Sequence, residues 1–222
     1  MEQADILTRR QQAFLRRIAR EPDIAREYVL SGGTALAAFH LRHRRSDDLD
    51  LFTRQHVDLD RMIAFMEACR TELNGEKLGW QKLYDRRIFV LQFFGGEELK
   101  VEFTRYPYAH LEQPTLQDGI LVASVRDIAA GKLTAILDRN EPKDYYDLYF
   151  LLIGGHTTLQ AMLRDVEAKF KRVIDPLHLG SQLECGTRLV AIPHLRRPVA
   201  KEDVQRFFRD LAKSLRSDIV EE

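Results

Sequence analysis

The sequence predicts an α/β fold in which a small mixed sheet with helices precedes a mainly helical C-terminal region. Residues 48–52 alternate strictly between polar and apolar side chains, which is typical of a half-buried strand. Two further β-rich runs follow within residues 88–103, and after them apolar residues recur mainly at helical spacing. We therefore expect two domains, residues 1–122 with the sheet and residues 123–222 with the helical region.

Composition and charge limit the classes of function. The 222 residues include 34 Lys and Arg and 34 Asp and Glu, so the formal net charge is zero and any polyanion site must be local. Cys69 and Cys185 match neither a disulfide framework nor a zinc-ligand spacing. No apolar run approaches the roughly 20 residues that span a bilayer, and the first residues lack a signal-peptide pattern. We expect a cytoplasmic protein with no membrane partner.

The first 40 residues predict a helix, a short strand, a glycine turn and a second helix. Apolar residues at helical spacing from Leu7 to Ile18 indicate an amphipathic helix among arginines. Residues 28–30 are a short apolar run, which a turn at Gly32–Gly33 closes. Residues 34–40 are rich in good helix formers.

The strand at residues 48–52 places the carboxylates of Asp48 and Asp50 on one face. Two such carboxylates suit shared coordination of hard divalent cations. An Asp-x-Asp pattern also arises by chance, and the second copy at residues 58–60 is interpreted as the start of a helix over residues 59–73. The glycine turn upstream and a carboxylate downstream distinguish the first copy from the second.

The two β-rich runs, residues 88–94 and 99–103, are joined by a short loop that contains Gly95 and Gly96. This is the pattern of a β-hairpin. Glu102 alternates with its two apolar neighbours in the second run, so its side chain projects from the face opposite to theirs. We expect Glu102 to converge with the two aspartates as a third acid.

The C-terminal region predicts helices with one interruption. A helix over residues 125–137 carries Lys132, and a second helix runs from residue 143 or 144 to Ile153. A break is expected around residues 174–200, which contain three prolines. The last amphipathic helix is marked by apolar residues from Val204 to Leu215.

These parts match what nucleotidyl transfer asks of a protein. A nucleoside triphosphate must be neutralised, held in line and approached closely by backbone amides. The Gly32–Gly33 pair leaves room for a triphosphate next to a helix N-terminus. Asp48, Asp50 and Glu102 would hold one or two Mg²⁺ ions, and Lys132 would bind the phosphates.

Residues 32–36 (GGTAL) and residues 44–52, with the pattern Arg-x-Ser-x-Asp-Leu-Asp-Leu-Phe, resemble the first motif of AbiEii/AbiGii-type toxin nucleotidyltransferases. Residues 127–149 resemble a later segment of that family, in which a lysine and a final aspartate are functional. The matches together cover about residues 30–150. The family belongs to the polymerase-β-like nucleotidyltransferase superfamily, so the resemblance implies that fold for the N-terminal core.

The resemblance implies an Mg²⁺-dependent enzyme that moves a nucleotide from an NTP to an acceptor, which is tRNA in the studied members. It also implies a toxin of a toxin–antitoxin or phage-defence pair, with an antitoxin as partner. Carried over to this sequence, the catalytic residues are Asp48, Asp50, Lys132 and Asp147. The nucleotide-binding residues are Gly32, Gly33, Thr34, Lys132 and Arg139, and the metal ligands are Asp48, Asp50 and Glu102.

Structural alternatives exist in the N-terminal part. Asp48 and Asp50 would be ordinary polar residues if their strand face only met solvent, and Glu102 if it lay on the exposed face of a hairpin. The basic run at residues 40–45 is either a local phosphate or RNA contact or a solvated charged loop.

The C-terminal part has alternatives of the same kind. Lys132 would be a solvated lysine if its helix face met water. Asp147 lies among aromatic residues and needs a partner if it is buried, which Arg139 or Lys143 would supply as a structural ion pair.

Two other functions stay open. The same chemistry can act on a protein hydroxyl or on a small molecule such as an aminoglycoside. A non-catalytic protein can also keep the fold and use its amphipathic C-terminal helix to bind a partner.

Overall fold

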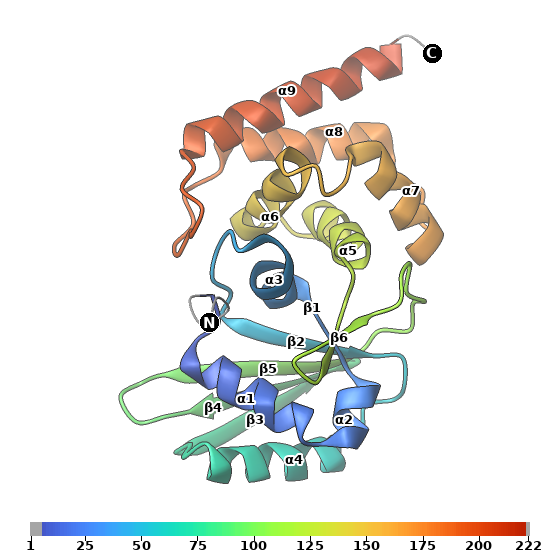
Figure 1. Cartoon of the computed structure of the whole chain (residues 1–222). Coiled ribbons are helices and arrows are strands. Elements are labelled where there is room, and N and C mark those ends of the chain that lie inside the picture. The colour runs from blue at the N-terminus through green and yellow to red at the C-terminus, as the bar shows by residue number, and fades with distance from the viewer. Residues whose placement is uncertain (1–5, 221–222) are drawn as a thin grey trace. The chain divides into compact units, whose positions relative to one another are not determined.

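The structure is a computed structural model that describes residues 6–220 (Figure 1). The chain divides into two units, Met1–Ser124 and Val125–Glu222, whereas the sequence-based division was placed between residues 122 and 123. The first unit combines strands and helices, and the second is helical. This confirms the predicted fold class.

The strands of the described residues all belong to the first unit. They are β1 (Val29–Ser31), β2 (Asp48–Thr53), β3 (Lys77–Leu83), β4 (Arg86–Gln92), β5 (Glu98–Arg105), β6 (Thr115–Gln117) and β7 (Ile120–Val122). They form one mixed sheet in the order β3-β4-β5-β2-β1-β7-β6. The central strand β2 is antiparallel to β1 and parallel to β5, so β1 and β5 flank the predicted aspartates.

Local capping explains where the helices of the first unit begin. These helical segments are α1 (Arg9–Ala19), α2 (Pro22–Glu27), α3 (Gly32–Ala35), the π-helical continuation η2 (Leu36–Leu41) and α4 (Leu59–Glu72). Thr8 and Gln11 form a reciprocal capping box at α1. The side chain of Asp58 accepts the N–H groups of Asp60 and Arg61, which confirms that the second Asp-x-Asp starts a helix.

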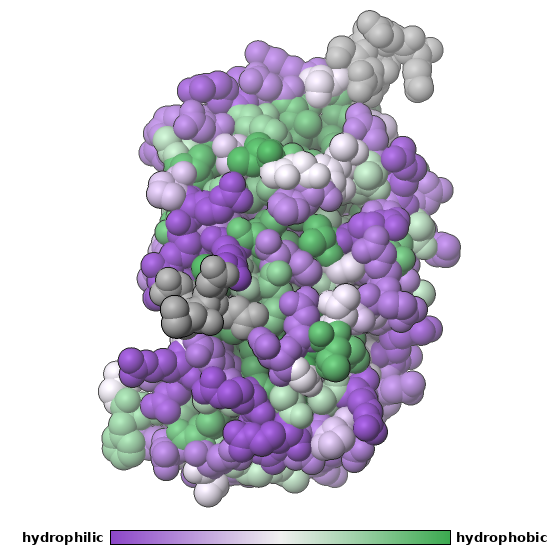
Figure 2. Space-filling view, in the orientation of Figure 1, coloured by the Kyte–Doolittle hydropathy of each residue, from purple (hydrophilic) through white to green (hydrophobic). Residues whose placement is uncertain are grey.

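The two faces of β2 have different surroundings. Leu49 and Leu51 are buried on one face, where Phe103 of β5 contacts Phe65 of α4 at a ring-centroid distance of 6.4 Å. Phe14 of α1 packs against Phe65 in turn, and Figure 2 shows hydrophilic residues over the outer face of α1. Alternation leaves the two aspartates of β2 on the opposite sheet face, partly exposed, on the side where α3 lies (Figure 1).

The second unit consists of helices joined by short loops. They are α5 (Val125–Asp138), α6 (Pro142–Ile153), α7 (Leu159–Phe170), α8 (Pro176–Cys185), the short 3₁₀ turn η3 (Gly186–Arg188) and α9 (Lys201–Val220). Tyr145 of α6 and Phe208 of α9 pack edge to face in its core. Within residues 6–220, none of the helices combines the length and the apolar character that a membrane span needs.

The predicted break at residues 174–200 is wrong over its first part, where α8 forms. Asp175 caps this helix by accepting the N–H of Leu177, and Pro176 occupies its first position. A proline is compatible with that position because the N–H it lacks would have no partner inside the helix.

Two ion pairs join α5 to α7. The ammonium of Lys169 donates to the carboxylate of Asp127, and both side chains are buried. Arg126 donates to both carboxylate oxygens of Asp165, from Nε at 3.0 Å and from Nη2 at 2.5 Å. The orientation of these two helices therefore depends on one buried ion pair and on a second pair whose carboxylate is buried while its guanidinium is partly exposed.

We expect Lys169→Met to lower the free energy of unfolding by about 3 kcal/mol, because Asp127 loses its buried ammonium while the aliphatic volume is kept. Urea unfolding followed by circular dichroism measures this change. Arg164→Met, at an exposed position of the same helix, is the control and should change stability by less than about 0.5 kcal/mol. Equal losses in both variants would contradict the prediction.

Candidate active site

The turn between β1 and α3 is built around the carboxylate of Asp50. Gly32 has a φ of +66°, and a Cβ added to it would lie 2.1 Å from Oδ2 of Asp50. Ser31 pairs with Asp50 across the two strands, which fixes this approach. Glycine is thus required at position 32 both for its backbone conformation and for the space that the carboxylate occupies.

Thr34 connects the same turn to the strand. Its side chain is buried, and its hydroxyl donates a short hydrogen bond to the backbone carbonyl of Asp48. This bond holds α3 against the start of β2. The hydroxyl has a structural partner here, and nucleotide binding by Thr34 stays a prediction.

Arg44 was not assigned a role from the sequence, yet it lies at the glycine turn. A Cβ on Gly33 would be 2.6 Å from an Nη2 atom of Arg44 and 2.9 Å from Oγ of Ser46. Arg44 and His43 are buried, so the basic run at residues 40–45 is not simply a solvated loop. Arg44 is part of the basic run in the sequence, but the sequence alone does not distinguish it from the other basic residues of that run.

The carboxylate of Asp48 is partly exposed and forms an ion pair with a lysine. Its Oδ2 is 3.0 Å from Nζ of Lys100, and roughly a third of each side chain is exposed, 34% and 39% respectively. A pair with this exposure contributes little stability, on the order of 0–1 kcal/mol. Asp48 can therefore exchange Lys100 for another cation at small cost.

Glu102 lies next to Asp50 in register and projects from the same face of the sheet. Unlike a residue on an exposed hairpin face, it is buried. Arg86 binds both of its carboxylate oxygens at 2.5 Å, and the hydroxyl of Thr104 donates to Oε1 at 2.7 Å. The third acid is thus where the alternation placed it, but it is held by an arginine.

The oxygen donors of this face fit a hard divalent cation. Mg²⁺ is usually bound by one or two carboxylates together with substrate phosphates, which Asp48 and Asp50 satisfy. In the described part of the chain no three acidic, histidine or cysteine side chains are grouped as a ready metal site. Glu102 would have to release Arg86 before it joined the two aspartates.

The predicted residues of the second unit form a buried cluster. Lys132 of α5 lies between two fully buried carboxylates of α6, 2.8 Å from Asp144 and 2.5 Å from Asp147. Arg139 contributes a second cation, 2.9 Å from Asp144. Lys132 is therefore not a solvated lysine. It is an ion-pair partner of Asp147.

Charge balance sets the pKa of Asp144. Burial raises the pKa of this carboxyl, but the adjacent Lys132 and Arg139 lower it by more, so the net pKa lies below the ordinary 3.8. Asp144 is consequently ionised at neutral pH. Two carboxylates and two cations then leave the cluster without a net charge.

The geometry can now be compared with known proteins. The sequence model of a family described as "Nucleotidyl transferase AbiEii toxin, Type IV TA system" matches residues 13–221. The chain belongs to the AbiEii family. It is accordingly a nucleotidyltransferase of a type IV toxin–antitoxin family, which implies an NTP substrate and an antitoxin partner.

Other comparisons agree with membership of the AbiEii family. The uncharacterized protein aq_aa25 of Aquifex aeolicus is 31% identical over 152 residues, which are 68% of this chain and 69% of that protein. A proposed nucleotidyltransferase from H. pylori has the same fold at a TM-score of 0.59 and 21% identity, covering 97% of this chain and 98% of its own. JHP933 from Helicobacter pylori also gives 0.59 and 21%, covering 96% and 92%. The fold resemblance implied by the sequence motifs is confirmed.

Gly32→Ala should reduce nucleotidyl transfer by about a hundredfold, because the new methyl group displaces the Asp50 carboxylate. A radiolabel transfer assay measures the rate. Gly95→Ala is the matched control, since Gly95 also has a positive φ, +86°, but no atom lies within 4 Å of the added methyl group. Both variants incur similar backbone strain, so equal losses of activity would contradict the role of crowding at Asp50.

Asp144→Asn should make the free energy of unfolding depend less on pH in the acidic range. The lowered pKa means that Asp144 contributes stability above about pH 3.8, which is lost as the pH falls through its folded-state pKa. We expect the variant to be about 3 kcal/mol less stable near neutral pH and the difference to narrow in acid. Urea unfolding from neutral pH downward measures both. Asp118→Asn, in an exposed turn, controls for the loss of one charge, and a constant difference would refute the linkage.

Proposed function

We propose that this protein transfers a nucleoside monophosphate from an NTP to a hydroxyl of tRNA, as the toxin of a toxin–antitoxin or phage-defence pair in the cytoplasm. One observation carries the proposal. Asp48 and Asp50 share the open face of β2, and the Asp50 carboxylate lies against the Gly32 turn. In a chain of the AbiEii family, two carboxylates beside a glycine turn support a site for nucleotidyl transfer.

The chain's own groups would divide the work as follows. The backbone at Gly32–Gly33 would approach the triphosphate, while the Asp50 carboxylate and Arg44 occupy the space that side chains would take there. Asp48 and Asp50 would hold Mg²⁺, which would neutralise phosphate charge and favour loss of the acceptor hydroxyl's proton. The acceptor oxygen then bonds to the α-phosphorus as the bond to the β-phosphate oxygen breaks and pyrophosphate leaves.

Arg44 and Lys100 have supporting parts in this proposal. Arg44 lies against Gly33 and so limits the conformations of the turn. Lys100 neutralises Asp48 on the open face at 3.0 Å, which a bound metal ion would do in its place. Both effects prepare the site before the nucleotide arrives, and preorganisation of this kind accounts for much of the rate of transfer enzymes.

The predicted roles of Lys132, Arg139 and Asp147 remain part of the proposal. Arg139 is about half exposed, so it can contact a phosphate while it stays near Asp144. Lys132 is bound by two carboxylates and would have to exchange one of them for a phosphate. The Asp147 carboxylate released in this exchange would accept the proton that the acceptor hydroxyl loses.

The double variant Asp48→Asn/Asp50→Asn should lose transfer by about a thousandfold or more, because the metal-binding charge is removed while side-chain size is kept. Purified protein is incubated with Mg²⁺, each α-³²P-labelled NTP in turn and total tRNA. Label should enter tRNA with the wild type alone. Asp60→Asn, in the exposed second Asp-x-Asp, is the control and should retain full activity.

The same experiment separates the alternatives. Label that moves only into protein from a lysate, or only into a small molecule, would contradict tRNA as the acceptor and keep the chemistry. Undiminished transfer by the double variant would contradict the assigned site.

A further inference from the structure

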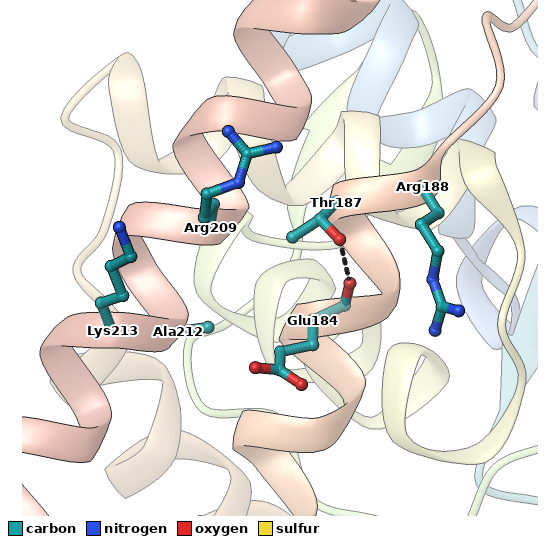
Figure 3. Close-up of a pocket in the computed structure, with 6 residues that line it drawn as sticks. All are labelled: Glu184, Thr187, Arg188, Arg209, Ala212 and Lys213. Carbon is teal, nitrogen blue, oxygen red and sulfur yellow. Dashed lines mark hydrogen bonds between the residues drawn. The ribbon is translucent and has the colours of Figure 1, made fainter.

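A basic pocket of about 450 Å³ lies in the second unit, between α9 and the end of α8 with η3 (Figure 3). It is lined by Glu184, Thr187, Arg188, Arg209, Ala212 and Lys213. Figure 3 shows Arg209 and Lys213 on neighbouring turns of α9, with Glu184 and Thr187 on the facing segment. We refer to these residues as the α9 pocket.

The pocket is a built feature of the fold. Gly186 brings η3 close to α9, since a Cβ on this glycine would lie 2.6 Å from the Phe208 ring. The hydroxyl of Thr187 donates to the backbone carbonyl of Glu184 at 2.7 Å and closes the last turn of α8. Arg188 is thereby placed along one side of the pocket, opposite the cations of α9.

The charges of the α9 pocket are not balanced. The lining contains three cations, Arg188, Arg209 and Lys213, and one carboxylate, and across the part of the chain that is described these three cations form no ion pair. Elsewhere in the same unit, cations such as Lys132 and Lys169 bind buried acids. Arg209 and Lys213 are also four residues apart on one helix, where like charges destabilise it. An anion bound between them would relieve this repulsion.

A second pocket makes the anion-binding region longer. This pocket, of about 190 Å³, shares Arg188 with the first and is also lined by Asn140. Asn140 directly follows Arg139, which binds Asp144 of the buried cluster. Arg188 lines both pockets, so their linings together carry three cations, Arg188, Arg209 and Lys213, and the amide of Asn140 within a single unit. Such a set suits several phosphates better than a single ion.

We propose that the α9 pocket binds the phosphodiester backbone of the RNA acceptor. This inference rests on the proposed function, because it assigns that enzyme a place for its acceptor. Arg209 and Lys213 contact phosphates as point charges, and Arg188 continues the contact toward Asn140. The interaction carries no base specificity, since phosphate contacts set position and not sequence.

The test is RNA binding by the full chain without NTP. A fluorescein-labelled tRNA transcript is titrated with wild type and with Arg209→Gln/Lys213→Gln, and anisotropy is recorded at several NaCl concentrations. We expect the variant to bind about tenfold more weakly in about 0.1 M salt and its salt slope to fall by between one and two.

The matched control removes two positive charges elsewhere. Lys77 and Lys82 are exposed on β3, and Lys77→Gln/Lys82→Gln should bind the transcript like the wild type. Arg188→Gln alone should weaken binding by a smaller factor, which keeps the inference testable if the α9 double variant melts early. Thermal denaturation of each variant confirms that its helices are intact.

The outcomes separate this inference from the proposed function. It is overturned if wild type binds no transcript, if both double variants lose affinity equally, or if the α9 variant loses binding of free ATP with RNA binding unchanged. Pocket-dependent RNA binding without any transfer would support this inference and contradict the proposed function. Transfer to tRNA with an unchanged KM for tRNA in the α9 variant would do the reverse.

Discussion

The contact between the Asp50 carboxylate and the backbone of Gly32 is the constraint on which the active-site face depends. It requires a residue without a Cβ and with a positive φ, and it requires β1 and β2 to pair so that Ser31 lies opposite Asp50. The Thr34 hydroxyl then joins the start of α3 to the carbonyl of Asp48. Turn, helix and acidic strand are consequently held in one arrangement, and fixed positions of this kind are what nucleotidyl transfer requires of its binding groups.

The second unit buries a cluster of charged side chains. Lys132 and Arg139 supply two positive charges to the two buried carboxylates of α6. Each ion would be costly alone, because desolvation in the interior exceeds what one distant partner returns. The cluster is stable as a set and unstable when any member is removed.

The sequence pattern predicted the site strand better than it predicted the sheet edges. The alternation at residues 48–52 is strong because Leu49 and Leu51 meet a core while the aspartates do not. The edge strand β3 (Lys77–Leu83) is almost wholly exposed, so it lacks the apolar alternation that would have revealed it. Strands β6 and β7 are each three residues long and too short for any period to show.

The sequence pattern did not predict which side chains Glu102 and Asp147 contact, because these contacts are made with residues distant in sequence. The alternation put Glu102 on the correct face, but nothing local indicated that Arg86, on another strand, would bind it. The alternative for Asp147 was an ion pair with Arg139 or Lys143, and the structure gives it a partner that was not considered, Lys132 on the preceding helix. Spacing determines where a side chain points, and tertiary packing determines what it meets there.

The basic residues show why a run of charge is a weak guide to a polyanion site. Residues 40–45 are a basic run for which RNA contact was one interpretation. In the structure, however, His43 and Arg44 are buried and Arg44 contacts the glycine turn. The cations of the α9 pocket are spread from position 188 to position 213 and form no run. An anion responds to charges that are exposed and unbalanced, whatever their order in the chain. A protein with zero net charge can therefore attract RNA at one place, because three of its cations line one pocket with a single carboxylate.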